Sequence, residues 1–358
     1  MQRLAAIGLA CWLACPAHAA TFDVPARGDV VGEVQVVVLA NARNTLLDVA
    51  RHFDLGLDEI RAANPGVRVW VPAQGARIVV PTEFILPPGP RAGIVIDIPL
   101  RRLYFYPPTR PGRAAQVITF PVGIARPGWP TPLGSTRIMA KDSDPSWIVP
   151  RDIVEEHMRE GAVSFPRYFP PGPDNPMGML ALRTGFPGIF IHGTDRPWGV
   201  GMRVSHGCIH LYPEDAALLF ARVRIGTPVR FIDLPVLVGA REGRLYLSSA
   251  PALADDPSSL TEATRAVAAL ARLRHDHPEL VPDPPWNRAL RAADEHGIVP
   301  VLIAPRGAAR RVGAAVRYAF EPYGIDANGG RPPRARHGVA QDAMAPRTPR
   351  AVVANLPR

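Results

Sequence analysis

The chain has 358 residues, enough for two domains, and 47% of them are hydrophobic, which excludes a globally disordered protein. No stretch after the N-terminal segment is long and apolar enough to cross a membrane. The formal net charge is +9, but much of the excess lies in residues 304–358, and no basic patch with interleaved aromatics indicates nucleic-acid binding.

The first residues have the pattern of a secretory signal peptide. Arg3 precedes an apolar run from Ala5 to Ala14, and the small-x-small sequence Ala17-His18-Ala19 follows. We therefore predict that residues 1–19 are removed by cleavage after Ala19 and that the protein is exported to the periplasm. An uncleaved anchor helix, or a lipoprotein signal ending at Cys15, is the alternative.

Residues 34–81 have the pattern of a small separate domain with the order strand, helix, helix, strand. Its predicted elements are a strand Val36–Leu39, a helix capped by Asn44-Thr45 that ends near Phe53, a helix Leu57–Ala63 stopped by Asn64-Pro65-Gly66, and a strand Arg77–Val80. This unit resembles the LysM module, which binds the glycan strands of peptidoglycan. A generic small α+β domain is the alternative. The Pro-rich segment 82–91 is predicted to be a linker.

A second domain, residues 92–235, is predicted to be mainly β with one main helix. Its expected elements are a hairpin of Ile94–Ile98 with Leu103–Tyr106, strands Ala115–Gly123 and Gly185–Ile191, a helix that begins at Pro213, and a closing strand around Val229–Phe231. The whole chain is thus expected to be mainly β, with a small βααβ unit ahead of a β-rich domain.

The C-terminal part is predicted to hold an appended region, residues 236–303, and a tail, residues 304–358. The appended region contains a strand Leu247–Ser249 and a helix Glu262–Arg274. His275 and His277 flank Asp276, which we interpret as a solvated helix end and not as a metal site. The tail is rich in Arg and Pro and poor in aromatics, which predicts disorder.

The chemistry is predicted to reside in Cys208 and His192. After signal cleavage Cys208 is the single cysteine left, and a lone thiol in an oxidising compartment indicates a reactive group. His192 ends a predicted strand and can act as the base that the thiol needs. Gly207 permits close approach of the backbone to a substrate, and the amides beside it could face an oxyanion.

The sequence Ser205-His206-Gly207-Cys208, preceded by His192, resembles the signature of the L,D-transpeptidases with a YkuD-type catalytic domain. Supporting matches are Thr131–Gly134, Asn175–Gly178 and Gly226–Val229. The resemblance implies that Cys208 attacks the third residue of a peptidoglycan tetrapeptide stem. It also implies that Gly193 orients His192 through its carbonyl group, that the His206, Gly207 and Cys208 amides form the oxyanion hole, and that Ser205 and the His206 side chain shape the site.

The resemblance further implies that an amine resolves the thioester without a cofactor or metal. That amine belongs to another stem, giving a 3-3 crosslink, or to the Lys of an outer-membrane lipoprotein; water would give an L,D-carboxypeptidase. His210 departs from the family, which usually has Asn or Arg there, and becomes a candidate substrate-binding residue. The loop Ser164–Gly178 is expected to cover the Cys208 groove, with Arg167 and Tyr168 holding the donor stem.

Other functions remain possible on the sequence alone. A papain-related wall endopeptidase would place its Cys before its His, which is the reverse of the order seen here. A non-catalytic wall-binding protein would use residues 34–81 as its active part and leave Cys208 inert, and a purely structural envelope protein would use neither.

Overall fold

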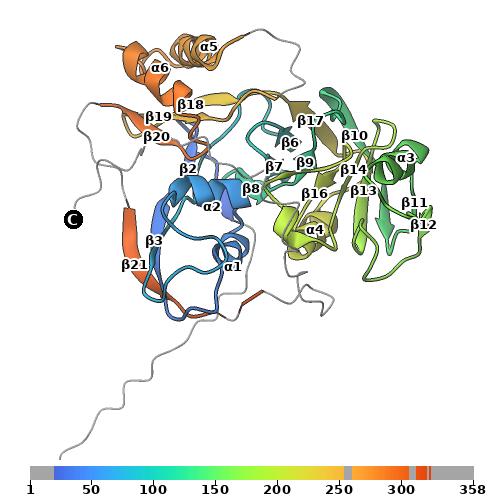
Figure 1. Cartoon of the computed structure of the whole chain (residues 1–358). Coiled ribbons are helices and arrows are strands. Elements are labelled where there is room, and N and C mark those ends of the chain that lie inside the picture. The colour runs from blue at the N-terminus through green and yellow to red at the C-terminus, as the bar shows by residue number, and fades with distance from the viewer. Residues whose placement is uncertain (1–19, 254–259, 306–311, 321, 324–358) are drawn as a thin grey trace, which may run out of the picture.

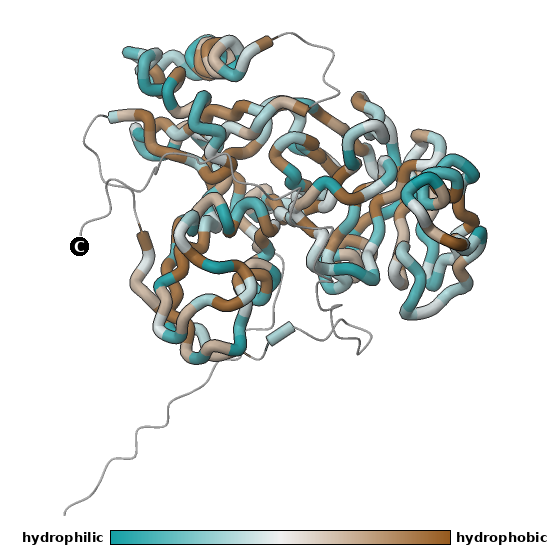
Figure 2. Tube along the Cα trace, in the orientation of Figure 1, coloured by the Kyte–Doolittle hydropathy of each residue, from teal (hydrophilic) through white to brown (hydrophobic). Residues whose placement is uncertain are grey.

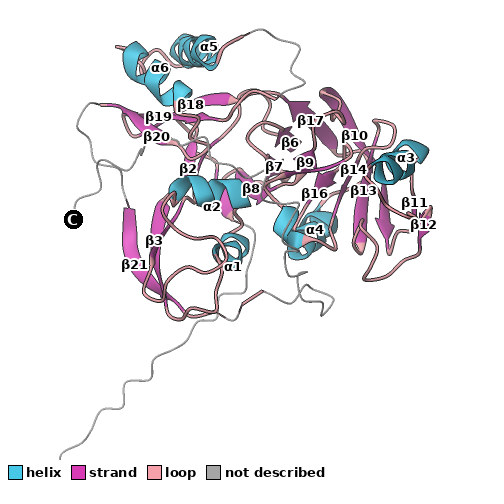
Figure 3. Ribbon diagram, viewed as in Figure 1, coloured by secondary structure: helices cyan, strands magenta, loops and turns pink. Residues whose placement is uncertain are grey.

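The computed structural model describes residues 20–253, 260–305, 312–320 and 322–323. The predicted signal peptide, residues 1–19, lies outside the described residues. The fold is mainly β, as predicted: strands fill the centre of the molecule and helices lie around them (Figure 3). Hydrophobic residues concentrate along those central strands (Figure 2).

The largest sheet has nine strands in the order β1-β8-β7-β6-β17-β10-β13-β14-β16. In that order, their bounds are Thr21–Asp23, Gln116–Pro121, Arg102–Tyr106, Gly93–Asp97, Pro228–Ile232, Gly134–Ser143, Leu180–Thr184, Phe190–His192 and Ile209–His210. Neighbouring strands are antiparallel except for two parallel pairs, β6 with β17 and β14 with β16. The second parallel pair carries the candidate catalytic residues.

The predicted hairpin of β6 and β7 is buried on both faces, which explains its continuous apolar sequence. Ile94 and Phe105 face the core of the second domain. Val95 and Tyr104 on the opposite face pack into a core shared with residues 34–81. The two predicted domains therefore share one continuous hydrophobic interior.

Residues 34–81, called the LysM-like unit below, have the predicted order of elements (Figure 1). These are β3 (Val34–Leu39), α1 (Leu46–His52), α2 (Leu57–Ala63) and β4 (Arg77–Val80), with β3 and β4 antiparallel. Thr45 caps α1 and shares a capping box with Asp48, which satisfies free amides at the start of the helix. The Asn64 side chain bonds Ile60 and Val79, so it joins α2 to β4.

The prediction that residues 304–358 form a disordered tail is wrong for one segment. Val312–Tyr318 form β21, which pairs in parallel with β3 and extends the sheet of the LysM-like unit. Tyr318 is buried in the core of this unit, and its hydroxyl donates to the Asp48 carbonyl at 3.2 Å. The strand is paired because β3 would otherwise offer an open edge.

The prediction that residues 82–91 form a linker is also wrong for the first half of this segment. Glu83–Ile85 form β5, which pairs with β2 (Val30–Gly32), and residues 82–87 are buried. Glu83 is fully buried and lies 2.5 Å from the Arg241 guanidinium. The prolines of this segment follow an apolar strand and do not separate two independent bodies.

Polar contacts also fix the LysM-like unit to the large sheet. Arg102 of β7 pairs with Glu59 of α2 through two bonds of 2.9 and 2.6 Å. Arg51 of α1 pairs with Glu214 through two bonds of 2.7 and 2.8 Å. The backbones meet so closely at Gly56 that a Cβ there would lie 2.6 Å from the Gly201 Cα.

The main helix predicted for residues 92–235 is present, and the structure adds a second, shorter one. Helix α4 (Pro213–Arg222) begins at Pro213 as expected, with Glu214 and Asp215 in its first turn. A second helix, α3 (Arg151–Arg159), lies at the outer edge of this domain beside β11 (Trp147–Ile148) and β12 (Tyr168–Phe169) (Figure 1).

The appended region has its own core. Strands β18 (Val236–Arg241), β19 (Arg244–Ser249) and β20 (Val301–Ala304) form an antiparallel sheet. Helices α5 (Glu262–Asp276) and α6 (Trp286–Asp294) pack on it. The sequence predicted α5 but missed α6.

Candidate active site

His192 ends strand β14, and Cys208 comes directly before the neighbouring parallel strand β16. His192 is the last residue of β14, and Cys208 ends the turn between β15 (Arg203–Ser205) and β16. Ile191 lies opposite Ile209, and His192 lies opposite His210. Continuing this register by one residue places Cys208 opposite Phe190. Because alternate residues share a face, both side chains project from the face opposite the buried isoleucines.

The imidazole of His192 is neutral and held in one orientation. Its side chain is buried, and Nδ1 lies 2.6 Å from the carbonyl oxygen of Gly193, as expected. Burial lowers the pKa of His192 to about 4, while backbone hydrogen bonds to Gly193 and Met177 act in the opposite direction. With Nδ1–H donating to Gly193, the free lone pair belongs to Nε2, and that nitrogen can accept a proton.

Cys208 is a neutral thiol at rest. Burial raises the pKa of Cys208 to about 11, with a smaller opposite contribution from a backbone hydrogen bond at Phe190. Sγ lies 3.5 Å from the Gly188 carbonyl oxygen, to which it can donate weakly. The resting pair is therefore a thiol and a neutral imidazole, and proton transfer must accompany attack on a substrate.

These two groups predict an unusual pH profile. His192 is protonated only below about pH 4, so kcat/KM should fall on the acid side near pH 4, well below the ordinary histidine value. Alkylation of Cys208 by iodoacetamide needs the thiolate, so its rate should climb without a plateau until about pH 11. Stopped-assay kinetics and mass spectrometry measure both curves. An alkylation plateau below pH 8 would mean a preformed thiolate–imidazolium pair.

His210 lies beside the base. Its ring centroid is 4.6 Å from that of His192, and its backbone pairs with Gly123. Burial lowers the pKa of His210 well below the usual range, and the neighbouring histidines add to this. His210 is thus a second neutral imidazole in the site, in contact with His192.

Ser205 and Gly207 shape the turn that carries Cys208. The Ser205 hydroxyl donates to the Cys208 carbonyl oxygen at 2.6 Å, and Thr131 donates to the Gly207 carbonyl oxygen at 2.8 Å. Gly207 has a φ of +111°, which side chains rarely adopt. The Gly207 amide was expected to face an oxyanion but donates to the Ser205 hydroxyl at 3.3 Å, so its hydrogen is already engaged.

The His206 side chain faces helix α3. Its Nε2 lies 2.9 Å from a carboxylate oxygen of Glu156 and 2.6 Å from the Arg126 guanidinium. Trp129 donates to the other Glu156 oxygen at 3.1 Å. Burial and Arg126 lower the pKa of His206, against the hydrogen bond to Glu156. Glu156 therefore anchors the turn beside Cys208, a role that no sequence signal indicated.

The loop Ser164–Gly178 touches the site at one end. A Cβ on Gly178 would lie 3.0 Å from the Thr194 amide nitrogen, so this segment presses on the backbone after His192. The Asn175 side chain holds it there through the Pro145 and Pro170 carbonyls. Arg167 and Tyr168 are exposed on or beside β12, and the contacts of that strand are with β11 rather than with Cys208.

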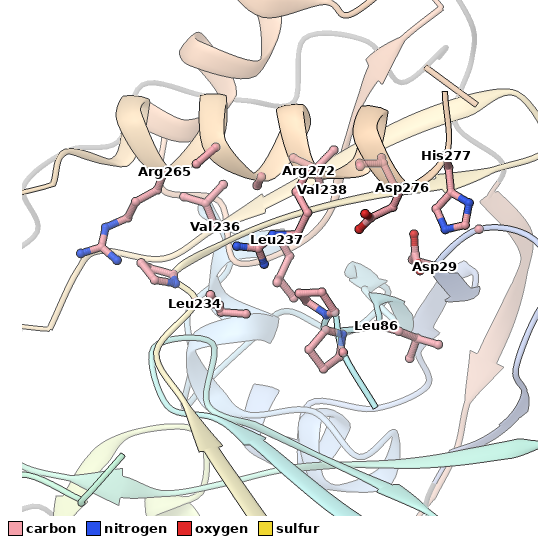
Figure 4. Close-up of a pocket in the computed structure, with 18 of the residues that line it drawn as sticks. Asp29, Leu86, Leu234, Val236, Leu237, Val238, Arg265, Arg272, Asp276 and His277 are labelled. Atoms are coloured by element: carbon pink, nitrogen blue, oxygen red, sulfur yellow. The ribbon is translucent and has the colours of Figure 1, made fainter. Parts of the chain in front are cut away.

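A cavity of about 420 Å³ lies elsewhere, between α5 and β18. Figure 4 shows its apolar floor with Leu86 and Leu237, and polar side chains such as Arg272 and His277 around it. Neither Cys208 nor His192 lines it. The chemistry and this cavity are therefore separate features.

Within residues 20–253, 260–305, 312–320 and 322–323, no three His, Cys, Asp or Glu side chains gather as a metal site. No helix in this part of the chain has the length and apolarity to span a membrane.

Comparison with known proteins gives one consistent result. Residues 91–231 match the YkuD family, described as the L,D-transpeptidase catalytic domain. The probable L,D-transpeptidase YcfS of Escherichia coli is 36% identical over 258 residues, which cover 69% of this chain and 79% of that protein. The probable L,D-transpeptidase YbiS of Escherichia coli is 37% identical, covering 69% of this chain and 78% of that protein.

Among solved structures, the catalytic domain of an Enterococcus faecium L,D-transpeptidase is 24% identical, with a TM-score of 0.29. The match covers 39% of this chain and 96% of that domain.

Proposed function

Because the chain belongs to the L,D-transpeptidase family, an enzyme family that acts on peptidoglycan, we propose that it transfers acyl groups between peptidoglycan stems through a thioester on Cys208. The family expected from the motif is thereby confirmed. One observation supports the cysteine mechanism most: Cys208, directly before β16, and a neutral, oriented His192 at the end of β14 project from the same face of the sheet.

The proposed reaction has two halves. Cys208 Sγ attacks the carbonyl of the third residue of a tetrapeptide stem while His192 Nε2 takes the thiol proton. The tetrahedral oxyanion collapses, the bond to the terminal D-alanine breaks, and His192 returns the proton to that amine. A second amine then attacks the thioester, loses a proton to His192 and releases the free thiol.

The oxyanion requires hydrogen-bond donors, and in the resting turn one of the candidate donors is already engaged. The Gly207 amide bonds the Ser205 hydroxyl at 3.3 Å, which is long and therefore weak. We propose that this bond yields to the oxyanion, with the Cys208 and His206 amides beside it. Ser205 would meanwhile keep its shorter bond to the Cys208 carbonyl.

The acceptor amine distinguishes the candidate activities. We propose a stem diaminopimelate, giving a 3-3 crosslink, or the Lys of an outer-membrane lipoprotein, in the periplasm; hydrolysis by water is the alternative. Incubating the enzyme with tetrapeptide-bearing sacculi and analysing muropeptides by mass spectrometry tests this. Crosslinked dimers that have lost one D-alanine support transpeptidation, whereas tripeptides alone indicate a carboxypeptidase.

We further propose that the LysM-like unit binds glycan strands, with Trp70 as a contact. Trp70 lies between α2 and β4 and is 56% exposed, which is unusual for so large an apolar side chain. Aromatic faces pack well on the C–H faces of sugars.

Trp70→Ala, made in an inactive Cys208→Ala chain, should therefore weaken binding to sacculi about tenfold. Pull-down with increasing amounts of purified sacculi measures the affinity. Trp286→Ala is the matched control, because that tryptophan is also partly exposed but lies on α6. Equal binding by all three chains would remove Trp70 from the glycan site.

We propose that the loop Ser164–Gly178 binds the donor stem. Phe165 stacks on His157 of α3 with centroids 3.9 Å apart, and Phe169 stacks on Trp147 at 5.5 Å. These contacts hold the loop in place while leaving Arg167 and Tyr168 exposed. Arg167 can then meet a stem carboxylate.

Replacing residues 165–173 by a short Gly-Ser turn should raise KM for a tetrapeptide donor about three- to tenfold. Asn175–Gly178 is kept, because that part presses on the strand end of His192. Steady-state kinetics and a melting curve measure the effect. An unchanged KM in a stably folded variant would show that the loop only packs aromatic side chains.

A further inference from the structure

Two buried aspartates meet where the LysM-like unit touches helix α4. Asp54 follows α1 and is 4% exposed, and Asp215 lies in the first turn of α4 and is 1% exposed. Their carboxyl groups are hydrogen-bonded to each other. The Asp215 Oδ2 atom is buried and has no hydrogen-bond partner among the described residues. We call these two residues the acid pair.

The neighbouring cations are already matched to other acids. Arg51 makes two bonds to Glu214, and Arg102 makes two bonds to Glu59. The acid pair therefore has no cation of its own among these groups, although Arg102 also contacts the Asp54 carbonyl oxygen at 3.1 Å.

Burial of the acid pair shifts the pKa values of both carboxyl groups. Burial raises the pKa of both carboxyls, Glu214 raises each further, and Arg102 opposes the shift. Asp54 also raises the pKa of Asp215, whereas the hydrogen bond with Asp215 lowers that of Asp54. The Tyr212 and Tyr323 hydroxyls also face this cluster and stay neutral, since burial raises the pKa of each. Because a buried charge without a close partner is costly, a positive group placed beside these two carboxyls would stabilise them.

The N-terminal segment brings one backbone nitrogen to this place. The Ala20 amide donates a hydrogen bond to the Asp54 carboxylate. The Ala20 carbonyl accepts from the Thr119 amide at 3.1 Å, and β1 then continues the pairing with Thr21 opposite Ile118. The position of this nitrogen is therefore fixed by the edge of the nine-stranded sheet. Ala20 is also the residue that follows the predicted signal cleavage site.

We propose that the acid pair is the binding site for the α-ammonium group of the processed chain, formed at Ala20 when the segment ending at Ala19 is removed. Hydrolysis of the Ala19–Ala20 bond adds water: Ala19 leaves as a carboxylate, and the Ala20 amine takes up the proton. The nitrogen that donated one hydrogen then carries three and a positive charge. One hydrogen can stay on Asp54, and another is available to the partnerless Asp215 oxygen.

Processing would thus strengthen the junction between α1 and α4. Helix α4 begins five residues after Cys208, and Tyr212 at its start donates to the Leu55 carbonyl at 3.0 Å. The ammonium would add a charged bond beside this contact. The inference uses the proposed export and cleavage, and it is independent of the acyl chemistry at Cys208.

The stability of the chain with and without the ammonium group should depend differently on pH. Without the ammonium, the acids have raised pKa values in the folded state, so stability falls as pH rises above the ordinary aspartate range. With the ammonium, the ionised acids are compensated until that group loses its proton, above about pH 8. The two forms should differ most near pH 7.5 and less near pH 5.

The experiment compares a chain that begins at Ala20 with one that begins at Ala17, both released from a fusion by a protease that leaves no extra residue. At pH 7.5 the Ala20 chain should melt about 3–6 °C higher. The difference should shrink near pH 5 and vanish when both chains carry Asp54→Asn together with Asp215→Asn. Equal melting temperatures at pH 7.5 would overturn the proposal.

Amine labelling gives a second readout that does not need a variant. Apart from the N-terminus the chain has one primary amine, Lys141, so acylated sites are easily separated by peptide mass spectrometry. At pH 7.5 the Ala20 α-amine should react at least about tenfold more slowly than the Ala17 α-amine, because its proton is held. Equal rates would overturn the proposal. The N-terminal mass of the exported protein tests the cleavage site separately, and a mature chain that begins elsewhere would also refute it.

Discussion

Replacing Cys208 by alanine should lower turnover about 10⁴-fold or more, because no other group can form the thioester. The fold should survive: the thiol contacts only backbone groups, the Gly188 carbonyl at 3.5 Å and the backbone of Phe190, and the substitution removes a single heavy atom. Muropeptide analysis and a melting curve measure the two quantities. A variant with near-wild-type turnover would refute the cysteine mechanism.

His192→Ala is the companion variant, with an expected loss of about 10²- to 10⁴-fold in kcat. His275→Ala is the matched control, because this histidine is exposed on α5. If His192→Ala retained full activity, like the control, the proton of Cys208 would have another acceptor. His210 is then the group to test, since its ring contacts that of His192 at 4.6 Å.

The proposed pair of Cys208 and His192 could be identified from the sequence because its signals are local. The residues around Cys208 form a short continuous motif, and the apolar run before His192 predicts its strand. The parallel pairing of β14 with β16 could not be predicted, since it depends on the whole sheet. That pairing explains why the two side chains share a face.

The support of the Cys208 turn was missed for a different reason. Glu156 lies fifty residues before His206, on a helix that the sequence reading did not identify. Its partners Arg126 and Trp129 lie in a third segment. Side chains from three separate segments leave no periodic pattern, so only the folded chain brings them together.

The predictions of a linker and of a disordered tail failed for the same reason. In both segments the average composition hid a short apolar strand. The linker holds three prolines but also Phe84, Ile85 and Leu86 in succession, which is the signal of a buried strand. The tail is dominated by Arg and Pro, and this composition hid the strand Val312–Tyr318. That strand pairs with β3, far away in sequence.

A docked LysM-like unit makes a strong prediction about Arg102. This residue is 2% exposed, its guanidinium bonds Glu59 twice, and it lies 4.0 Å from the centroid of the Phe84 ring. Arg102→Leu should cost about 3–5 kcal/mol, because it leaves Glu59 buried and unpaired. The melting temperature should fall by about 10 °C.

Two further variants separate charge from packing. Arg102→Leu combined with Glu59→Leu should recover part of the loss, since neither buried charge then remains. Arg151→Leu is the surface control: its pair with Glu155 is exposed, so the melting temperature should stay close to that of the wild type.

The shape of the melting curve distinguishes a docked unit from a tethered one. A flexibly linked module would melt separately, and Arg102→Leu would then leave the catalytic transition unchanged. The shared core of Val95 and Tyr104 with residues 34–81 instead predicts one cooperative transition that shifts as a whole. In that case glycan binding at the LysM-like unit would hold Cys208 at a fixed distance from the strand, and the enzyme would reach only stems within that span.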